Sequence, residues 1–200
     1  QNLKELSHYD FNYRLNGTNC NNTNRTDNNK MEKIKAIELF SGSGKISRSL
    51  KELHISSTSF DNRRRKGVCE PDVRIDIQNL TRSKVLEITN SNKIEIVFAG
   101  LPCTIWSNAS GGFHLDKNFN PKTELAIEHL KLTNHVLKLI KELNPDFYFI
   151  ENPRGKLRYY KPMIDFLVKT NGMTKELTLS SYGFPTTKPT NIFTNMHHLK

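Results

Sequence analysis

The stretch IKAIELFSGSG, at residues 34–44, decides the fold that the sequence predicts. Its apolar part, Ile34–Phe40, predicts a buried strand, and the Gly/Ser turn that follows opens a helix expected over Gly42–Leu53. Glycines in such a turn let the backbone pass close to a ligand, which the amino end of the helix then faces. Taken alone, the turn is also compatible with tight packing and no ligand.

The same alternation of strand and helix continues along the chain. Further strands are predicted over Ile55–Phe60, Asp72–Ile77, Ile94–Phe98, Phe147–Ile150, Leu177–Ser181 and Asn191–Thr194. Two more helices are expected over Lys122–Leu143 and Tyr160–Thr170. Because the clearest strands are almost continuously apolar, they are typical of strands buried on both faces. We therefore expect an α/β fold with a doubly wound, mostly parallel sheet.

Composition and charge limit the classes of function. The 200 residues include 30 Lys and Arg against 20 Asp and Glu, and this net charge of +10 favours a polyanionic partner such as nucleic acid. Residues 1–30 hold nine asparagines and predict a flexible extension, with one folded domain over 31–200. No apolar run is long enough for a membrane span. The three cysteines fit neither a disulfide framework nor a metal knuckle, so we expect no metal and a reducing, cytoplasmic location.

Chemically capable side chains follow the ends of the predicted strands, where open α/β sheets bind ligands. Asp61 is placed to bind a ribose diol or to cap a helix, and Asp76 to bind an adenine amino group or to cap a turn. The fourth predicted strand, Ile94–Phe98, is followed by Cys103, which is either a nucleophile or a buried structural thiol. Glu151 ends a very apolar strand, which is costly unless its carboxylate is used or paired. A glycine turn followed by two acids, each at a strand end, suits a nucleoside-bearing cofactor. The cofactor should have no pyrophosphate, because the third glycine of the GxGxxG dinucleotide motif is absent after Gly44.

Four segments, in the same order along the chain, resemble motifs of the DNA cytosine-5 methyltransferase family. Glu38–Gly44 looks like the cofactor-binding first motif, and Leu101–Ser107 resembles the Pro-Pro-Cys-Gln-x-x-Ser nucleophile loop. Glu151–Pro153 resembles the Glu-Asn-Val motif, and Tyr182–Pro185 resembles the Tyr-Gly-x-Pro-Gln segment. Together they span about residues 34–195, and the whole is similar to compact phage-type methylases. The resemblance implies a Rossmann-like methyltransferase fold in a bacterium or a phage-infected host cell. Its biological role would be restriction–modification, restriction evasion or regulation.

The resemblance also implies a reaction and a set of site residues. The reaction is methyl transfer from S-adenosylmethionine to C5 of cytosine in DNA, through a covalent bond between Cys103 and C6. Catalysis is assigned to Cys103, Glu151 and Asn152. Cofactor binding is assigned to Phe40, Ser41, Gly42, Gly44, Asp61, Asp76 and Pro102, and DNA binding to Ser107, Arg154 and Lys188.

Departures from the family pattern keep other interpretations open. Leu101 and Thr104 replace a proline and a glutamine, Thr186 replaces another glutamine, and Lys188-Pro189-Thr190 stands where the family has Arg-x-Arg. The target-recognition region and the last two motifs would lie beyond Lys200. The sequence is therefore a fragment, a minimal form, or a protein that borrows those parts from a second chain. A methylase relative that binds DNA or cofactor without turnover, and methyl transfer to RNA, are the alternatives.

Several further residues carry weaker expectations. Arg154 or Arg158 could replace the second arginine of the family's Arg-x-Arg, which helps to hold the target base. Trp106 could stack or only pack the loop. His114 is expected to be idle at the surface. The basic run Arg63, Arg64, Arg65 and Lys66 could grip phosphates or form a solvated loop.

Overall fold

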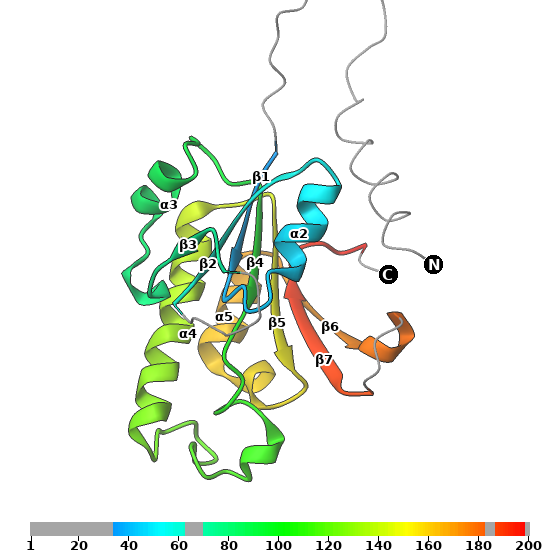
Figure 1. Cartoon of the computed structure of the whole chain (residues 1–200). Coiled ribbons are helices and arrows are strands. Elements are labelled where there is room, and N and C mark those ends of the chain that lie inside the picture. The colour runs from blue at the N-terminus through cyan, green and yellow to red at the C-terminus, as the bar shows by residue number, and fades with distance from the viewer. Residues whose placement is uncertain (1–33, 63–69, 183–186, 199–200) are drawn as a thin grey trace, which may run out of the picture. The chain divides into compact units, whose positions relative to one another are not determined.

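A computed structural model of the chain describes residues 34–62, 70–182 and 187–198 (Figure 1). The expected N-terminal extension, the basic run Arg63–Lys66 and the segment 183–186 lie outside these residues. Within the described part, no helix is long and apolar enough to span a membrane.

In the described residues, seven strands form one sheet in the order β3-β2-β1-β4-β5-β7-β6. The strands are β1 (Lys35–Leu39), β2 (Ser56–Asp61), β3 (Val73–Arg74), β4 (Ile96–Gly100), β5 (Phe147–Pro153), β6 (Met173–Thr178) and β7 (Pro189–Thr194). Strands β1 to β5 pair in parallel, whereas β7 lies antiparallel between β5 and β6. The doubly wound, mostly parallel sheet expected from the sequence is confirmed.

Four α-helices accompany the sheet in the described residues, together with several short 3₁₀ turns. The helices are α2 (Lys45–Glu52), α3 (Arg82–Ile88), α4 (Glu124–Leu143) and α5 (Lys161–Lys169). Helix α2 lies on the face of the sheet that carries Glu38, because Glu38 accepts a hydrogen bond from Ser47 N in its first turn. Helix α5 lies on the other face, where Phe166 packs edge-on against Tyr148 of β5. The two sides of the sheet are therefore both covered, as in doubly wound folds (Figure 1).

Local signals explain how the longest helix begins and ends. Thr123 caps the amino end of α4, its hydroxyl accepting a hydrogen bond from Ala126 N at 3.2 Å. At the other end Asn144 adopts a left-handed conformation with φ 47°, and Pro145 follows it. Between these ends, Val136, Ile140 and their apolar neighbours bury one side of the helix in the core.

Some element boundaries differ from the prediction. The third predicted strand, Asp72–Ile77, pairs only over Val73–Arg74, and Ile77 already begins the 3₁₀ helix η1 (Ile77–Asn79). The strand predicted over Leu177–Ser181 was misplaced, since β6 ends at Thr178 and the 3₁₀ helix η4 (Leu179–Tyr182) follows. Helix α3 was not predicted. It is short, and its clearest signal is the Thr81 cap, which accepts from Lys84 N at 3.3 Å.

Candidate active site

The carboxyl ends of β1, β2, β4 and β5 meet at one edge of the sheet and bring the predicted motifs together (Figure 1). The glycine turn follows β1, and Asp61 ends β2 beside it. The cysteine loop follows β4, and Glu151 and Asn152 lie in the last part of β5. Residues far apart in the sequence thus become neighbours because parallel strands end together.

The glycine turn is held against β2 by a carboxylate. Asp61 is buried, and its Oδ2 accepts a hydrogen bond from Gly42 N at 2.9 Å. Ser41 N donates to Phe60 O at 3.2 Å, so two successive residues of the turn are tied to neighbouring residues of β2. Gly42 and Gly44 have φ values of 52° and 64°, in the left-handed region that favours glycine. The sequence therefore needs glycine in this turn for its backbone path.

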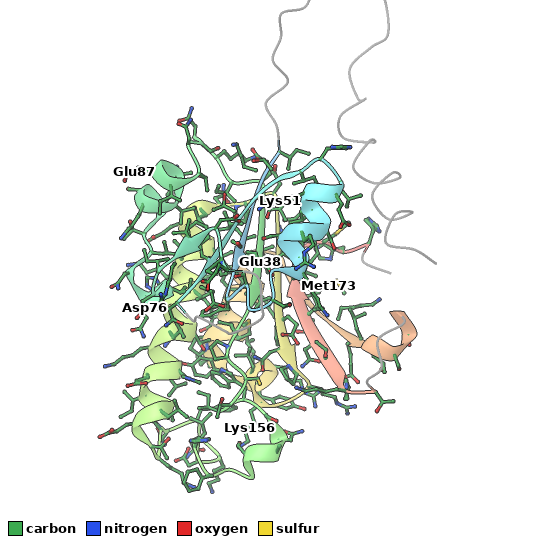
Figure 2. The ribbon with its side chains drawn as sticks, in the orientation of Figure 1. Glu38, Lys51, Asp76, Glu87, Lys156 and Met173 are labelled. Atoms are coloured by element: carbon green, nitrogen blue, oxygen red, sulfur yellow. The ribbon has the colours of Figure 1, made fainter. Side chains whose placement is uncertain are left out.

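A second carboxylate, Glu38, fixes the start of helix α2, which follows the glycine turn, and it was not among the predicted site residues. Glu38 lies in β1 with only 5% exposure (Figure 2), and its Oε2 accepts from Ser47 N of α2 at 2.9 Å. Ser57 of β2 adds a hydrogen bond to the Ser47 hydroxyl at 3.0 Å. An acidic residue inside an otherwise apolar strand was the signal that could have identified it.

Asp76 lies away from the glycine turn, beyond the short edge strand β3 (Figure 2). It caps η1, with Oδ1 accepting from Gln78 N at 3.0 Å, and the residue is exposed. The structure thus bears out the capping alternative, while contact of Asp76 with an adenine amino group stays a prediction.

The turn that carries Cys103 is tight and anchored from two strands. Cys103 is a half-buried free thiol, and its carbonyl accepts from Trp106 N at 3.0 Å and from Ser107 N at 2.9 Å. Just before it, Leu101 O accepts from the side chain of Asn152 in β5 at 3.0 Å. Asn152 is fully buried, so this hydrogen bond is shielded from water. Asn152 therefore holds the turn in position.

The far side of the cysteine loop is fastened to the segment after β5. Lys156 N donates to Trp106 O at 2.8 Å, and Ser107 forms an isolated antiparallel bridge with Gly155. A Cβ added to Gly155 would lie 2.2 Å from Trp106 O, so no other residue fits without displacing the backbone. Trp106 is fully buried and its ring lies 5.0 Å from that of Tyr160, which supports the interpretation that it packs the loop.

Glu151 lies between Gly100 of β4 and Ile192 of β7 in the register of the sheet. Burial raises the pKa of its carboxyl above the ordinary value of 4.5, and the positive charge of Lys188 partly opposes the shift. A carboxyl group with a raised pKa can hold a proton in a cleft and deliver it to a ligand. Lys188 is exposed and directly precedes β7, at the same edge of the sheet.

The arginines considered for DNA contacts are paired with a glutamate. Arg154 Nη1 lies 3.1 Å from Glu176 Oε1, and Arg158 Nη1 lies 3.8 Å from Glu176 Oε2. Ser107 accepts a hydrogen bond from Ala109 N at 3.2 Å. His114, expected to be idle, is half-buried, and its Nδ1 lies 3.0 Å from the Thr123 hydroxyl that caps α4.

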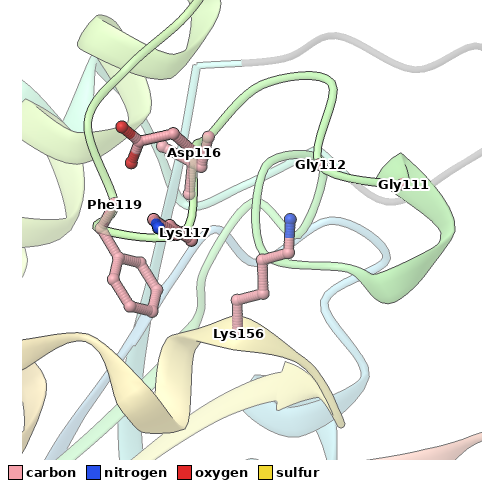
Figure 3. A pocket seen from close by; sticks show the side chains of 7 residues that line it. Gly111, Gly112, Asp116, Lys117, Phe119 and Lys156 are labelled. Atoms are coloured by element: carbon pink, nitrogen blue, oxygen red, sulfur yellow. The ribbon is translucent and has the colours of Figure 1, made fainter.

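The loop after Cys103 also borders an open hollow of about 400 Å³ (Figure 3). It is lined by Gly111, Gly112, Leu115, Asp116, Lys117, Phe119 and Lys156. None of the predicted catalytic or cofactor residues lines it. No group of residues suited to holding a metal ion occurs in the described ranges.

The order of the strands, with β7 antiparallel between β5 and β6, together with the glycine turn after β1, defines the class of Rossmann-like methyltransferase folds. The sequence model of the C-5 cytosine-specific DNA methylase family matches residues 34–174, which is more than half of the chain. The chain belongs to this family.

One solved structure illustrates the likeness in fold. It is an E. coli protein provisionally assigned as a DNA modification methyltransferase encoded within a prophage. The two share 18% sequence identity with a TM-score of 0.59, over 80% of this chain and 46% of the other. This chain thus spans less than half of that structure's length. Comparison with curated proteins gives no match.

Proposed function

We propose that the protein transfers a methyl group from S-adenosylmethionine to C5 of cytosine in DNA, with Cys103 bound covalently to C6 during the reaction. One observation carries the proposal: Asn152 fixes the turn before Cys103, and the residue preceding Asn152 is Glu151, a carboxyl group with a raised pKa. A nucleophile and a proton donor on neighbouring strand ends are the two groups that this reaction requires.

The residues after β1 and β2 fit the proposed cofactor. A turn that contains Gly42 and Gly44, both with left-handed φ values, precedes a helix, and glycine has no side chain to cover the backbone at these two positions. The buried Asp61 carboxylate lies beside the turn. The residues that would hold the cofactor are Phe40, Ser41, Gly42, Gly44, Asp61, Asp76 and Pro102. When bound, the sulfonium compound supplies an electrophilic methyl group.

The reaction follows from the poor nucleophilicity of C5. The Cys103 thiolate adds to C6, and the Glu151 proton goes to N3, so that the electron pair of the C5–C6 double bond becomes available at C5. After C5 accepts the methyl group, a base removes the C5 proton. The electron pair of the C5–H bond restores the double bond as the thiolate leaves, and N3 returns its proton to the Glu151 carboxylate. The target cytosine must leave the duplex, which costs a few kcal/mol.

Phosphate and base contacts would come from Ser107, Arg154 and Lys188, at the same edge of the sheet. The net charge of +10 supports a nucleic-acid substrate. We further propose that residues 31–200 form the catalytic domain and residues 1–30 an extension. A second chain that supplies target recognition is consistent with the 46% coverage of the related structure.

The test is transfer of a labelled methyl group to mixed-sequence duplex DNA, followed by nucleoside analysis. We expect 5-methylcytosine with the wild-type protein and with Cys20→Ala, and no product with Cys103→Ala. Product on RNA but not on DNA would contradict the proposed substrate.

One observation favours the alternative of binding without turnover. Thr190 stands where the family has its second arginine, and it is buried in β7 and carries no charge. Binding of S-adenosylmethionine and DNA with no transfer and no covalent complex would support this second function.

A further inference from the structure

A group of buried polar atoms without partners includes one on Asn152, whose side-chain amide holds the cysteine turn. Asn152 of β5 and Asn191 of β7 are directly opposed in the sheet, and both are buried. Within residues 34–62, 70–182 and 187–198, Asn191 Nδ2 and Oδ1, Asn152 Oδ1 and Arg158 Nε find no hydrogen-bond partner. Native proteins rarely leave buried polar groups unpaired, because each costs about 1–3 kcal/mol. A bound ligand with its own donors and acceptors would supply the missing hydrogen-bond partners.

A cavity of about 350 Å³ is lined by two of the residues that carry these atoms, Arg158 and Asn191. Its lining is Arg158, Tyr159, Thr174, Glu176 and Asn191. Glu176 is opposite Asn191 in the register of β6 and β7, so their side chains share one face of the sheet. Asn152 lies on the same face, whereas Glu151, its neighbour along β5, lies on the other. The cavity is thus separated by the sheet from the proposed catalytic carboxyl, and its volume is within the range of small-molecule sites.

The lining offers the groups that recognise the edge and the face of a nucleobase. The Asn191 amide presents one donor and one acceptor, the pair that binds an amino group next to a ring nitrogen. Glu176 adds acceptor oxygens, and Arg154 and Arg158 beside it bring positive charge. Tyr159 is 59% exposed, with the Arg158 guanidinium 4.6 Å from the centre of its ring, and the ring can support a stacked base.

We propose that this cavity is a second nucleobase site, which receives an unpaired base of the DNA substrate. The base carries an amino group beside an unprotonated ring nitrogen on its Watson–Crick edge, as adenine and cytosine do. The proposal rests on the proposed function in taking DNA as the substrate. Asn152 connects the two sites: its Nδ2 holds Leu101 O, its Oδ1 has no partner in the described part of the chain, and the residue lies directly opposite Asn191 in the sheet. An occupant bonded there would stabilise the turn before Cys103.

The experiment is a titration of the ¹⁵N-labelled full chain with dAMP, dCMP, dGMP, dTMP and inorganic phosphate, followed through the side-chain NMR signals of Asn191 and Arg158. We expect saturable shifts with dAMP or dCMP and none of that size with phosphate. Absence of shifts with all four nucleotides would overturn the proposal, because the cavity would then hold only water. Equal shifts with inorganic phosphate would overturn it as well, since the arginines alone would be binding.

Variants separate binding from structure. Asn191→Leu removes the unpaired amide, so we expect it to leave the melting temperature unchanged or higher and to weaken dAMP or dCMP binding by about tenfold or more. Should Asn191→Leu fail to fold, Thr174→Phe fills the cavity from an exposed position and is expected to abolish the same shifts. Lys175→Gln is the matched control, since Lys175 points to the opposite face of β6. Unchanged nucleotide affinity in Thr174→Phe would contradict the assignment.

These titrations require neither methyl transfer nor cofactor. A protein that binds nucleotides at Asn191 but forms no covalent complex through Cys103 would refute the proposed function alone. A protein that forms the complex without nucleotide shifts would refute the second site alone.

Discussion

Asn152 donates its side-chain amide to the carbonyl of Leu101 at 3.0 Å, so the strand that carries the proposed proton donor also holds the turn that carries the proposed nucleophile. The residues are 51 positions apart in sequence, and the hydrogen bond is buried. Displacement of this contact would move Cys103 relative to Glu151.

We expect Asn152→Leu to weaken the coupling between the two strand ends. The Leu101 carbonyl would lose its buried donor, which should lower the free energy of unfolding by about 1–3 kcal/mol. DNA that contains 5-fluorocytosine traps the covalent bond between Cys103 and C6. The rate of this trapping should fall by about tenfold or more, because catalytic geometry tolerates little displacement. Urea denaturation and trapping rates measure the two effects, with exposed Asn92→Leu as the control. A trapping rate in Asn152→Leu equal to that of the wild type would show that the turn keeps its position without the hydrogen bond from Asn152.

Gly155→Ala tests the second anchor of the cysteine loop. The added Cβ would lie 2.2 Å from Trp106 O, and the backbone must shift to accept it. We expect a loss of about 1–3 kcal/mol in unfolding free energy, together with reduced methyl transfer. Gly100→Ala is the matched control, because its Cβ would lie at an ordinary 3.8 Å from Phe40 O. Equal stability of the two variants in thermal unfolding would argue against this anchor.

Glu151 should make stability depend on pH. Its pKa is raised in the folded state, so the carboxyl favours folding while protonated, and this contribution is lost as the pH rises from 4.5 through the raised pKa. Glu151→Gln cannot ionise. The variant should therefore match the wild type at low pH and become relatively more stable at higher pH, as unfolding midpoints across the range would show. A stability difference that stays constant with pH would contradict the raised pKa.

The same substitution separates stability from catalysis. Without a proton to give to N3, we expect Glu151→Gln to lose about 100-fold or more in methyl transfer. Lys188→Met should raise the pKa of Glu151 further, because it removes the opposing positive charge. The pH profile of methyl transfer would then move to higher pH. An unchanged profile would show that the charge of Lys188 does not influence the pKa of Glu151.

Asp61 is expected to govern cofactor affinity through the glycine turn. Asp61→Ala removes the acceptor for Gly42 N, whereas Asp61→Asn keeps an acceptor oxygen and loses only the charge. We therefore expect weaker S-adenosylmethionine binding in both, with the larger loss in Asp61→Ala, measured by calorimetry. The exposed Asp146→Asn serves as the control. An affinity equal to wild type in Asp61→Ala would place the cofactor elsewhere.

Strands and loops that carry a motif could be predicted from the sequence because their signals are local. Ile34–Phe40 and the glycine turn are an example, since apolar continuity and glycine content reveal them directly. Asp61 and Cys103 were assigned to one edge of the sheet by the general rule for parallel strands. The end of β5 was placed too early because Glu151, Asn152 and Pro153 do not look like strand residues, although all three pair with β7.

Other features depend on contacts that no local pattern shows. Arg154 and Arg158 pair with Glu176 because β6 lies antiparallel to β7 at the edge of the sheet. An alternation of strands and helices predicts parallel neighbours and does not indicate this antiparallel pair. Glu38 belongs to the Glu38–Gly44 segment, but its hydrogen bond with Ser47 N depends on how α2 packs against β1. The absence of a partner for Asn191 is likewise a property of packing.

The most direct test of the central claim is covalent trapping on mixed-sequence duplex DNA that contains 5-fluorocytosine, in the presence of S-adenosylmethionine. Fluorine at C5 blocks the final proton removal, so a bond between Cys103 and C6 persists. Mass spectrometry of the digested complex should locate the DNA adduct on the peptide that contains Cys103, and Cys103→Ala should give none. S-adenosylmethionine binding without any adduct, or an adduct on another residue, would contradict the account.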